Sequence, residues 1–372
     1  MKFSIDRAAL LRALNHVQSV VERRNTIPIL SNVLLKADDG TLTMTATDMD
    51  LEINESVAAT ISKPGATTAP AHTLHDIVRK LADEGPVEIE LNSEGTQMTV
   101  QAGRSKFKLS CLPVADFPAL GSTELPGTFG LPAAELRALI DRTKFAMSTE
   151  ETRYYLNGIY LHAADNGGVP VLRAVATDGH RLARFEMPLP AGAESMPGVI
   201  IPRKAIGELR QLADEAADTI TIQLSENKIR FAFDHIILTS KLIDGTFPDY
   251  QRVIPQGNDK VVEVDPKLFT SAIDRVSTIS DGKSRAVKIT LNNKQMVLSA
   301  SSPEAGSATE ELEVSGETAL EIGFNAKYLL DITSQISQEG GCRLTLADAA
   351  SPTIIQDNAD PSSLYVLMPL RV

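Results

Sequence analysis

The chain has 372 residues, of which 43% are hydrophobic and 23% are charged, and its formal net charge is −12. This length predicts two or three domains, and the near-average composition excludes a disordered or fibrous chain. The acidic excess argues against a protein that grips nucleic acid through its overall charge, because such binding depends on Lys and Arg residues that neutralise phosphates.

The first residues do not resemble an export signal or a membrane anchor. Asp6 and Arg7 interrupt the apolar stretch that a secretory signal would need, and no window reaches the length of a membrane helix. Only two cysteines occur, Cys111 and Cys342, and both are flanked by apolar residues. This usage predicts buried, inert thiols in a reducing compartment. We therefore expect a cytoplasmic protein with no thiolate metal cluster.

The first part of the chain reads as a helix followed by strands and a second helix. Apolar residues recur at helical spacing over residues 10–21, and Asp6 stands where an N-cap would. The stretches TLTMTATD (41–48) and LEINESV (51–57) alternate in polarity, as half-buried strands do. A second helix is predicted near residues 73–83, and further alternating strands follow it.

This pattern occurs three times along the chain. VLRAVATD (171–178) echoes TLTMTATD (41–48), and the two copies lie 130 residues apart (171 − 41). QMVLSASS (295–302) is a weaker third copy, and LRQLADE (209–215) repeats VRKLADE (78–84). Repeats of this kind indicate that one structural unit recurs. We therefore predict an α+β protein of three tandem copies, each with two helices on antiparallel sheets.

The second copy contains ATDGHRLARF (176–185), in which an acid, a glycine and a histidine are consecutive. Asp178-Gly179 between alternating residues predicts a tight hairpin turn whose central positions prefer positive φ. Alternatively, Asp178 and His180 could be the working pair of a hydrolase. The matching residues 48–50 of the first copy include no histidine, and no Ser or Cys nearby fits a nucleophile-elbow pattern. The sequence therefore favours the turn.

Two other motifs have ordinary structural explanations. SDGKS (280–284) ends like a phosphate-binding loop in which Lys283 would reach the phosphate of a nucleotide, but Ser277 stands where that motif needs a glycine. His72 and His75 could face one metal ion, yet no third ligand is identifiable nearby. We predict no metal site and no cofactor.

A few residues are candidates for contact with a partner. Arg24 is expected at the end of the first helix, where a cation also favours the helix dipole. Arg153 precedes Tyr154 and Tyr155, a combination that either lies against nucleic acid or begins a half-buried strand. The ending YVLMPLRV (365–372) is apolar where termini are usually polar, so it forms either a core edge strand or a groove that a partner fills.

Taken together, four stretches resemble the beta subunit of bacterial DNA polymerase III, the sliding clamp family. They are RYYLNG (153–158), ATDGHRLA (176–183), FPDYQRVIP (247–255) and the YVLMPLRV ending, and the likeness covers the full length in order. The resemblance implies a noncatalytic processivity factor. Such a factor slides along duplex DNA without sequence specificity and tethers the replicative polymerase catalytic subunit, the clamp loader, other polymerases and repair proteins through short apolar peptides.

The same resemblance implies clamp domains at residues 1–121, 128–252 and 255–372. A head-to-tail homodimer would then form a six-domain ring, with helices lining a hole that holds duplex DNA. Such a ring holds DNA by topology, so its phosphate contacts need only be weak, and the acidic excess can lie mainly outside. A compact peptide-binding scaffold that never encloses DNA stays open as an alternative, and a hydrolase is less favoured.

The resemblance also assigns residues to each role. DNA contacts fall on Arg24, Tyr154, Tyr155, Arg203 and Lys204. The dimer contact falls on Phe107, Leu109 and Ile279. The peptide cleft between the second and third domains is assigned to Leu156, Thr177, Gly179, His180, Arg181, Leu182, Pro248, Arg252, Val253, Val366, Leu367, Met368, Pro369, Leu370 and Arg371. Ser284 and Pro352 depart from the family pattern, so the rim is expected to differ in peptide preference.

Overall fold

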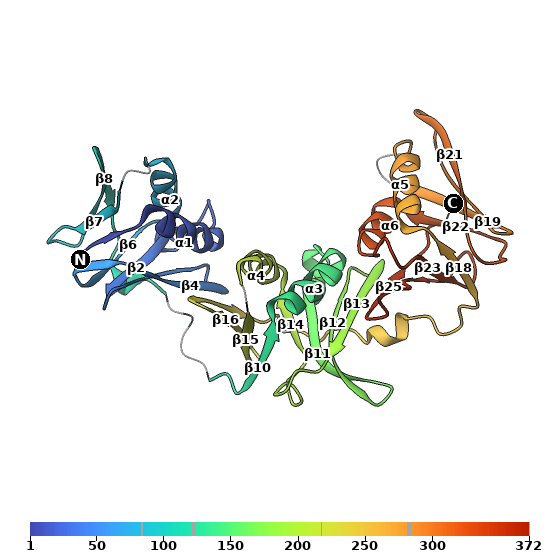
Figure 1. The fold of residues 1–372 in the computed structure, drawn as a ribbon, viewed down its shortest axis with the longest axis horizontal. Helices are drawn as coiled ribbons and strands as arrows, with labels where there is room; N and C mark the ends of the chain where they lie inside the picture. Colours follow the sequence, from blue (N-terminus) through green and yellow to red (C-terminus); the bar gives the residue numbers. More distant parts are fainter. Residues whose placement is uncertain (83–84, 119, 121–123, 217, 281–284, 372) are drawn as a thin grey trace. The chain divides into compact units, whose positions relative to one another are not determined.

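The computed structural model describes residues 1–82, 85–118, 120, 124–216, 218–280 and 285–371 (Figure 1). The chain forms two compact units. The first comprises Met1–Leu136, Ala191–Met196 and Lys204–Leu242, and the second comprises Arg137–Pro190, Pro197–Arg203 and Ile243–Val372. Lys283 and Ser284, which the sequence singled out, lie outside the described residues.

The first unit contains two antiparallel sheets. The five-stranded sheet has the order β5-β1-β7-β8-β9, with β1 (Lys2–Ile5), β5 (Thr60–Lys63), β7 (Val87–Leu91), β8 (Gln97–Ala102) and β9 (Ser105–Ser110). The eight-stranded sheet has the order β10-β15-β16-β17-β4-β3-β2-β6, with β2 (Asn32–Asp38), β3 (Thr41–Thr47), β4 (Leu51–Ala58), β6 (Gly65–Pro70), β10 (Gly127–Pro132), β15 (Thr219–Leu224), β16 (Lys228–Phe233) and β17 (Ile236–Lys241).

Helices α1 (Arg7–Val20) and α2 (Ala71–Lys80) lie side by side in the first unit (Figure 1). Asp6 caps α1, because its carboxylate accepts a hydrogen bond from the Ala9 N–H at 2.9 Å. Leu10, Leu14 and Val17 form the buried stripe of α1, as the spacing predicts. Helix α2 begins after Pro70 and ends at Lys80, so it lies earlier than the predicted 73–83.

The second unit repeats this architecture. Its eight-stranded sheet has the order β14-β11-β12-β13-β25-β24-β23-β18, with β11 (Gly158–Asn166), β12 (Val169–Thr177), β13 (Arg181–Pro188), β14 (Val199–Pro202), β18 (Lys260–Val264), β23 (Cys342–Leu346), β24 (Thr353–Asp357) and β25 (Ser363–Leu367). The four-stranded sheet has the order β21-β20-β19-β22, with β19 (Ala286–Asn292), β20 (Gln295–Ser302), β21 (Gly306–Glu313) and β22 (Leu320–Asn325). Helices α5 (Pro266–Ser277) and α6 (Ala326–Thr333) pack against each other (Figure 1).

Two further helices contain residues of both units. They are α3 (Ala133–Thr143) and α4 (Arg203–Glu215). Each predicted copy therefore has two helices. Strands β4, β7 and β15 show the predicted alternation because one of their faces is buried, whereas β12 and β25 are buried on both faces.

Both eight-stranded sheets join strands from neighbouring copies of the repeat. In the first unit β17 of the second copy pairs antiparallel with β4 of the first, with Leu238 opposite Ile53. In the second unit β25 of the third copy pairs with β13 of the second, with Tyr365 opposite Ala183. The copies are thus connected by continuous main-chain hydrogen bonding as well as by side-chain packing.

Both cysteines are free and buried, as predicted. Burial raises the pKa of the Cys342 thiol to about 12, so this side chain stays protonated at neutral pH. No helix in the described part of the chain has the length and apolar character to cross a membrane.

Candidate functional site

The stretch ATDGHR forms the loop between β12 and β13. The Asp178 carboxylate accepts hydrogen bonds from the N–H groups of His180 and Arg181, at 2.9 and 3.0 Å. Gly179 has φ of 89°, which is the left-handed region that glycine adopts readily. The predicted turn is therefore present, although it has three residues and Asp178 does not take a positive φ. Because the Asp178 carboxylate holds the backbone, it does not orient the His180 ring for catalysis.

The first copy contains the same loop without histidine. Asp48 accepts hydrogen bonds from the N–H groups of Asp50 and Leu51, at 2.9 and 2.7 Å, and Met49 takes the place of Gly179 with φ of 78°. A methionine in this strained region shows that the loop geometry is maintained by the carboxylate cap even where glycine is absent. The loop is thus a feature of the repeat, and its histidine belongs to the second copy.

An apolar pocket of about 320 Å³ lies beside this loop, entirely within the second unit. Ten of the predicted cleft residues line it: Leu156, Thr177, Gly179, His180, Arg181, Leu182, Pro248, Val253, Val366 and Met368. Four residues that were not assigned to the cleft also line it: Arg153, Tyr155, Asp249 and Tyr250. The pocket joins side chains of the second and third copies, and most of its lining is apolar, so it suits an apolar ligand with a few polar groups.

The floor of the pocket is held by a buried polar network. The Tyr250 hydroxyl accepts a hydrogen bond from Arg173 at 2.9 Å and lies 3.0 Å from His162 Nε2. His162 Nδ1 faces the Ala163 carbonyl at 2.9 Å, so Nδ1 carries the proton and Nε2 accepts from the Tyr250 hydroxyl. Burial lowers the pKa of His162, which favours this neutral form. Glu186 balances the charge of Arg173 at 2.8 Å.

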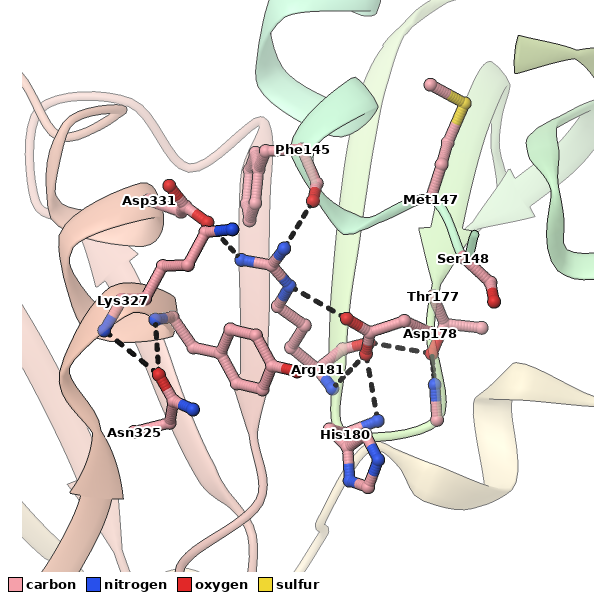
Figure 2. Close-up of polar contacts among 12 residues, drawn as sticks. Phe145, Met147, Ser148, Thr177, Asp178, His180, Arg181, Asn325, Lys327 and Asp331 are labelled. Carbon is pink, nitrogen blue, oxygen red and sulfur yellow. Dashed lines mark hydrogen bonds and ion pairs between the residues drawn. The ribbon is translucent and has the colours of Figure 1, made fainter. Parts of the chain in front are cut away.

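Arg181 lines the pocket, yet its guanidinium group is engaged by the protein (Figure 2). Nε donates to Asp178 at 3.1 Å, Nη1 donates to Asp331 at 2.5 Å, and Nη2 donates to the Phe145 carbonyl at 2.6 Å. The guanidinium also lies 4.3 Å from the centre of the Tyr328 ring. Its side chain is only 7% exposed, so Arg181 is a structural connection between the β12–β13 loop and helix α6.

The chain end divides between two surfaces. Val366 and Met368 face the pocket, whereas Leu367 is fully buried on the other side of β25. Leu370 and Arg371 line a separate hollow over β19, β20 and β21, and the Leu370 N–H donates to the Gly323 carbonyl at 2.8 Å. Of the remaining predicted cleft residues, Pro369 is not part of the pocket lining, and Arg252 points to solvent and pairs with Asp249 at 2.8 Å.

The structure places the five candidate DNA contacts in different environments. Arg24 is exposed beyond the end of α1, so the expected position at the helix terminus is wrong. Tyr154 is 53% exposed in a 3-10 helix (Glu151–Leu156), whereas Tyr155 turns into the pocket. These tyrosines therefore precede the strand instead of beginning it.

The two cations at the start of α4 already have partners. Arg203 donates to the Ser148 carbonyl at 2.7 Å. Lys204 lies 2.5 Å from Asp48 and 3.4 Å from Glu22. Burial opposes the charge of Lys204, but these carboxylates favour it more strongly, so its pKa is raised. Lys204 is therefore committed to an ion pair at the loop of the first copy.

The candidate dimer residues lie near sheet edges and helix ends. Phe107 and Leu109 are on β9, an edge strand of its sheet, and Phe107 is 37% exposed while Leu109 is buried. Ile279 is half-buried in the turn after α5. His72 bonds to Gln18 and Val21, His75 bonds to Asn15, and no group of three or more potential metal ligands occurs among the described residues.

Comparison with known proteins identifies the family. Three successive family models match the chain: the N-terminal, central and C-terminal domains of the DNA polymerase III beta subunit match residues 1–121, 130–249 and 251–371. The chain belongs to the DNA polymerase III beta subunit family. Its function is that of a sliding clamp, the processivity factor of DNA replication, and the predicted tandem organisation is confirmed. The domain boundaries chosen from the sequence stay a prediction.

Individual clamps match over their entire length. The beta sliding clamp of Caulobacter vibrioides is 54% identical and that of Escherichia coli is 40% identical, with 100% of both chains covered in each comparison. A crystal structure of the Bartonella birtlesii sliding clamp bound to griselimycin matches with a TM-score of 0.97 at 50% identity, and all of both chains is covered. The Caulobacter crescentus clamp structure matches with a TM-score of 0.95 at 53% identity.

Sequence reasoning missed several residues of this clamp's pocket. Tyr250 lies inside the quoted FPDYQRVIP stretch, and its position two residues after Pro248 was the available signal. Tyr155 was assigned to DNA and Arg153 was left without a role, because a basic residue beside aromatic residues suits a nucleic-acid contact equally well. Only the fold shows that the Tyr155 ring turns toward the core cluster beneath the pocket.

Proposed function

We propose that two copies of this clamp form a closed ring around duplex DNA, and that the pocket holds short apolar peptides of partner proteins. The partners are the replicative polymerase catalytic subunit, the clamp loader, other polymerases and repair proteins. The chain itself is noncatalytic. The observation that carries the peptide proposal is the apolar pocket lined by Leu156, Leu182, Val253, Val366 and Met368. A short peptide can bury apolar side chains there while main-chain groups at the rim fix its orientation.

The ring proposal follows from how the copies join within each unit. The fourth strand of one copy pairs with the last strand of the next copy, as β4 does with β17 and β13 with β25. The strands left over by this rule are β21 in the third copy and β9 in the first, and each is an edge of its sheet. Pairing β21 of one molecule with β9 of a second would give both edges a partner and repeat the same joint.

Side chains at these two edges support the pairing. Lys106 and Lys108 are exposed on β9, and Glu311 and Glu313 are exposed on β21. Opposite charges across an antiparallel seam are stabilising. Phe107 would be covered by such a contact, which explains why a large aromatic side chain is partly exposed on an edge strand.

Weak DNA contacts fit a protein that slides. Arg24, Tyr154 and Arg203 are the exposed members of the five candidates, and Arg203 already donates to the Ser148 carbonyl, so Arg24 and Tyr154 are the stronger candidates. We propose that these two residues touch the DNA, with Arg203 in a supporting role, and that Lys204 and Tyr155 serve the protein's own structure. The net charge of −12 supports weak contacts over a tight basic grip.

A pair of tail variants tests the peptide site. Met368 and Leu370 are both partly exposed apolar residues of the chain end, but only Met368 lines the pocket. Met368→Ala should weaken the binding of a labelled peptide by about tenfold, equivalent to about 1.4 kcal/mol, because a truncated floor residue loses contact area. Leu370→Ala should leave the affinity unchanged. Fluorescence anisotropy measures both affinities.

The probe is the tightest binder among overlapping peptides copied from the polymerase catalytic subunit. Deletion of residues 368–372 should abolish capture of the same peptide while the dimer stays folded. Undiminished affinity in this deletion would remove the pocket assignment. We also propose that griselimycin, which the related Bartonella birtlesii clamp binds, competes with this peptide for the present chain.

A further inference from the structure

Helix α6 presents two side chains to the β12–β13 loop that forms one wall of the pocket. Tyr328 and Asp331 are three residues apart, so they lie on one face of the helix. The Tyr328 ring lies beneath the Arg181 guanidinium and 6.4 Å from the His180 ring, and Asp331 receives the hydrogen bond from Arg181 Nη1. Asn325 caps α6 by accepting from the N–H groups of Lys327 and Tyr328 (Figure 2).

We propose that Asp331 is a positioning residue for the peptide pocket, which it controls through Arg181 without contacting the ligand. The ion pair holds the loop of residues 178–180 against α6, and this contact sets where Gly179 and His180 stand at the rim. The inference rests on the proposed peptide-binding function. It adds a residue outside the pocket lining to the determinants of affinity.

The geometry around Arg181 supports a positioning role over a ligand contact. Each of its three guanidinium nitrogens donates to a protein acceptor, and the guanidinium carbon lies 5.2 Å from the centre of the Phe145 ring and 4.3 Å from that of the Tyr328 ring. A guanidinium with all three nitrogens engaged cannot turn to a peptide without breaking a charged hydrogen bond. Its contribution to the pocket is therefore the position of the loop.

The loop depends on the same ion-pair system. Asp178 uses Oδ1 to accept from the backbone of His180 and Arg181, and it uses Oδ2 to accept from Arg181 Nε. A displaced guanidinium would therefore free Oδ2 and leave the Asp178 carboxylate attached only through the oxygen that holds the loop backbone. Loss of the Asp331 charge should propagate to the pocket rim through these contacts, whereas the pocket floor at Tyr250 has a separate network.

The molecule offers a closely matched control. Asp360 pairs with Arg142 at 3.2 Å, and its side chain is 30% exposed, the same fraction as that of Asp331. This second pair also connects the second copy to the third, but it does not contact the loop of residues 178–180. Asp331→Asn and Asp360→Asn thus remove the same charge from equally exposed carboxylates, and only the pair of Asp331 includes a residue that lines the pocket, Arg181.

The experiment measures the affinity of the labelled polymerase peptide by anisotropy and the stability by urea unfolding, with the full chain. Asp331→Asn should weaken peptide binding by about fivefold, Asp331→Glu should restore most of the loss, and Asp360→Asn should leave affinity within twofold of the wild type. Arg181→Lys should weaken binding as well, and the double variant Arg181→Lys with Asp331→Asn should be no weaker than Arg181→Lys alone, because both changes break one connection.

Several results would overturn the inference. Wild-type affinity in Asp331→Asn would show that the pair does not position the loop. Equal weakening by Asp360→Asn would show that any loss of stability lowers affinity, and additive losses in the double variant would show that Arg181 acts directly on the peptide. Failure of the wild-type chain to bind any peptide would instead contradict the proposed function, so the two failures are distinguishable.

Discussion

At the residue scale, the most unusual group is a buried glutamate in the first unit. Glu55 lies on the core face of β4 and is fully buried. His16 on α1 bonds to Glu55 through Nδ1 at 2.8 Å and to Glu215 through Nε2 at 2.9 Å, and His235 approaches the second Glu55 oxygen at 3.5 Å. Arg12 lies 3.5 Å from the same His235 nitrogen. His16 can serve both carboxylates only when it carries two protons.

The pKa of His16 gives a pH-dependent prediction. Burial opposes its charge, but the hydrogen bonds to Glu55 and Glu215 favour it more strongly, so its pKa is raised above the ordinary 6.5. A group whose pKa rises on folding adds stability that is complete below the unfolded value and is lost as the pH rises through the folded value. The free energy of unfolding should therefore decrease as the pH rises above about 6.5, by the amount that the charged form of His16 contributes.

The variant His16→Gln tests this prediction, because an amide can still donate to Glu55 but cannot become charged. We expect it to lower the free energy of unfolding by about 1–2 kcal/mol at pH 6, and by less at pH 9. His72→Gln is the control, since His72 bonds to an amide oxygen and a carbonyl instead of carboxylates. Urea unfolding at several pH values measures the difference. A constant difference between the wild type and His16→Gln would contradict the assignment.

Residue roles were predictable where they depend on neighbours in the sequence. The Asp178-Gly179 turn is local, since its acceptor and donors lie within three residues, and it was predicted. The partners of Arg181 were not predictable, because Asp331 lies 150 residues away and no local pattern relates the two. The same limit applies to Lys204, because its partners Asp48 and Glu22 lie in the first copy, far away in the sequence.

At the element scale, one type of joint accounts for both eight-stranded sheets. A recurring pairing of this kind gives each copy the same surroundings, apart from the free edges β9 and β21. First-helix cations follow the repeat as well. His16 and Arg275 stand at the same distance from the N-caps Asp6 and Asp265, and they contact the acids Glu55 and Glu310. The helices thus bond to their own sheets through a repeated ion pair.

A charge reversal tests the proposed joint between molecules. Changing both Lys106 and Lys108 to Glu should raise the dimer dissociation constant at least tenfold, because like charges would then meet along the seam. Adding Glu311→Lys and Glu313→Lys to the same chain should restore the dimer. Sedimentation velocity over a concentration series measures the change.

The control for this reversal changes the net charge equally. Lys36→Glu with Lys80→Glu places two reversals on β2 and α2, away from both sheet edges, and should leave the dimer intact. If the control dissociates as readily as the edge variant, the effect comes from net charge and not from the joint.

Element types were more predictable than element ends. Alternating polarity predicted strands such as β4 and β15, which have one buried face, and the helical stripe from Leu10 to Val17 predicted α1. The end of α1 at Val20 was not visible, since the apolar pattern continues to Val21 and no glycine marks a stop. Sheet order could not be predicted either, because pairing between copies depends on contacts that are far apart in sequence.

At the scale of the whole molecule, three copies of one domain explain how an acidic protein can stay on DNA. A chain with a net charge of −12 gains little from adhesion to phosphates, so its retention must come from enclosure. The threefold repeat was predictable from the sequence because TLTMTATD, VLRAVATD and QMVLSASS are separated by nearly constant offsets. Closure of the ring depends on a contact between two molecules, so it was expected from the family resemblance and not from the repeat itself.

The most direct test of enclosure is retention on DNA of different topology. The clamp is loaded onto nicked circular DNA by its clamp loader, the complex is isolated by gel filtration, and one portion is linearised with a restriction enzyme. We predict that the protein stays on the circle at moderate salt and is released within minutes from the linear DNA, because an encircling ring slides off free ends. Equal retention on circular and linear DNA would contradict enclosure, since a protein held only by adhesion stays bound whether or not the DNA has free ends.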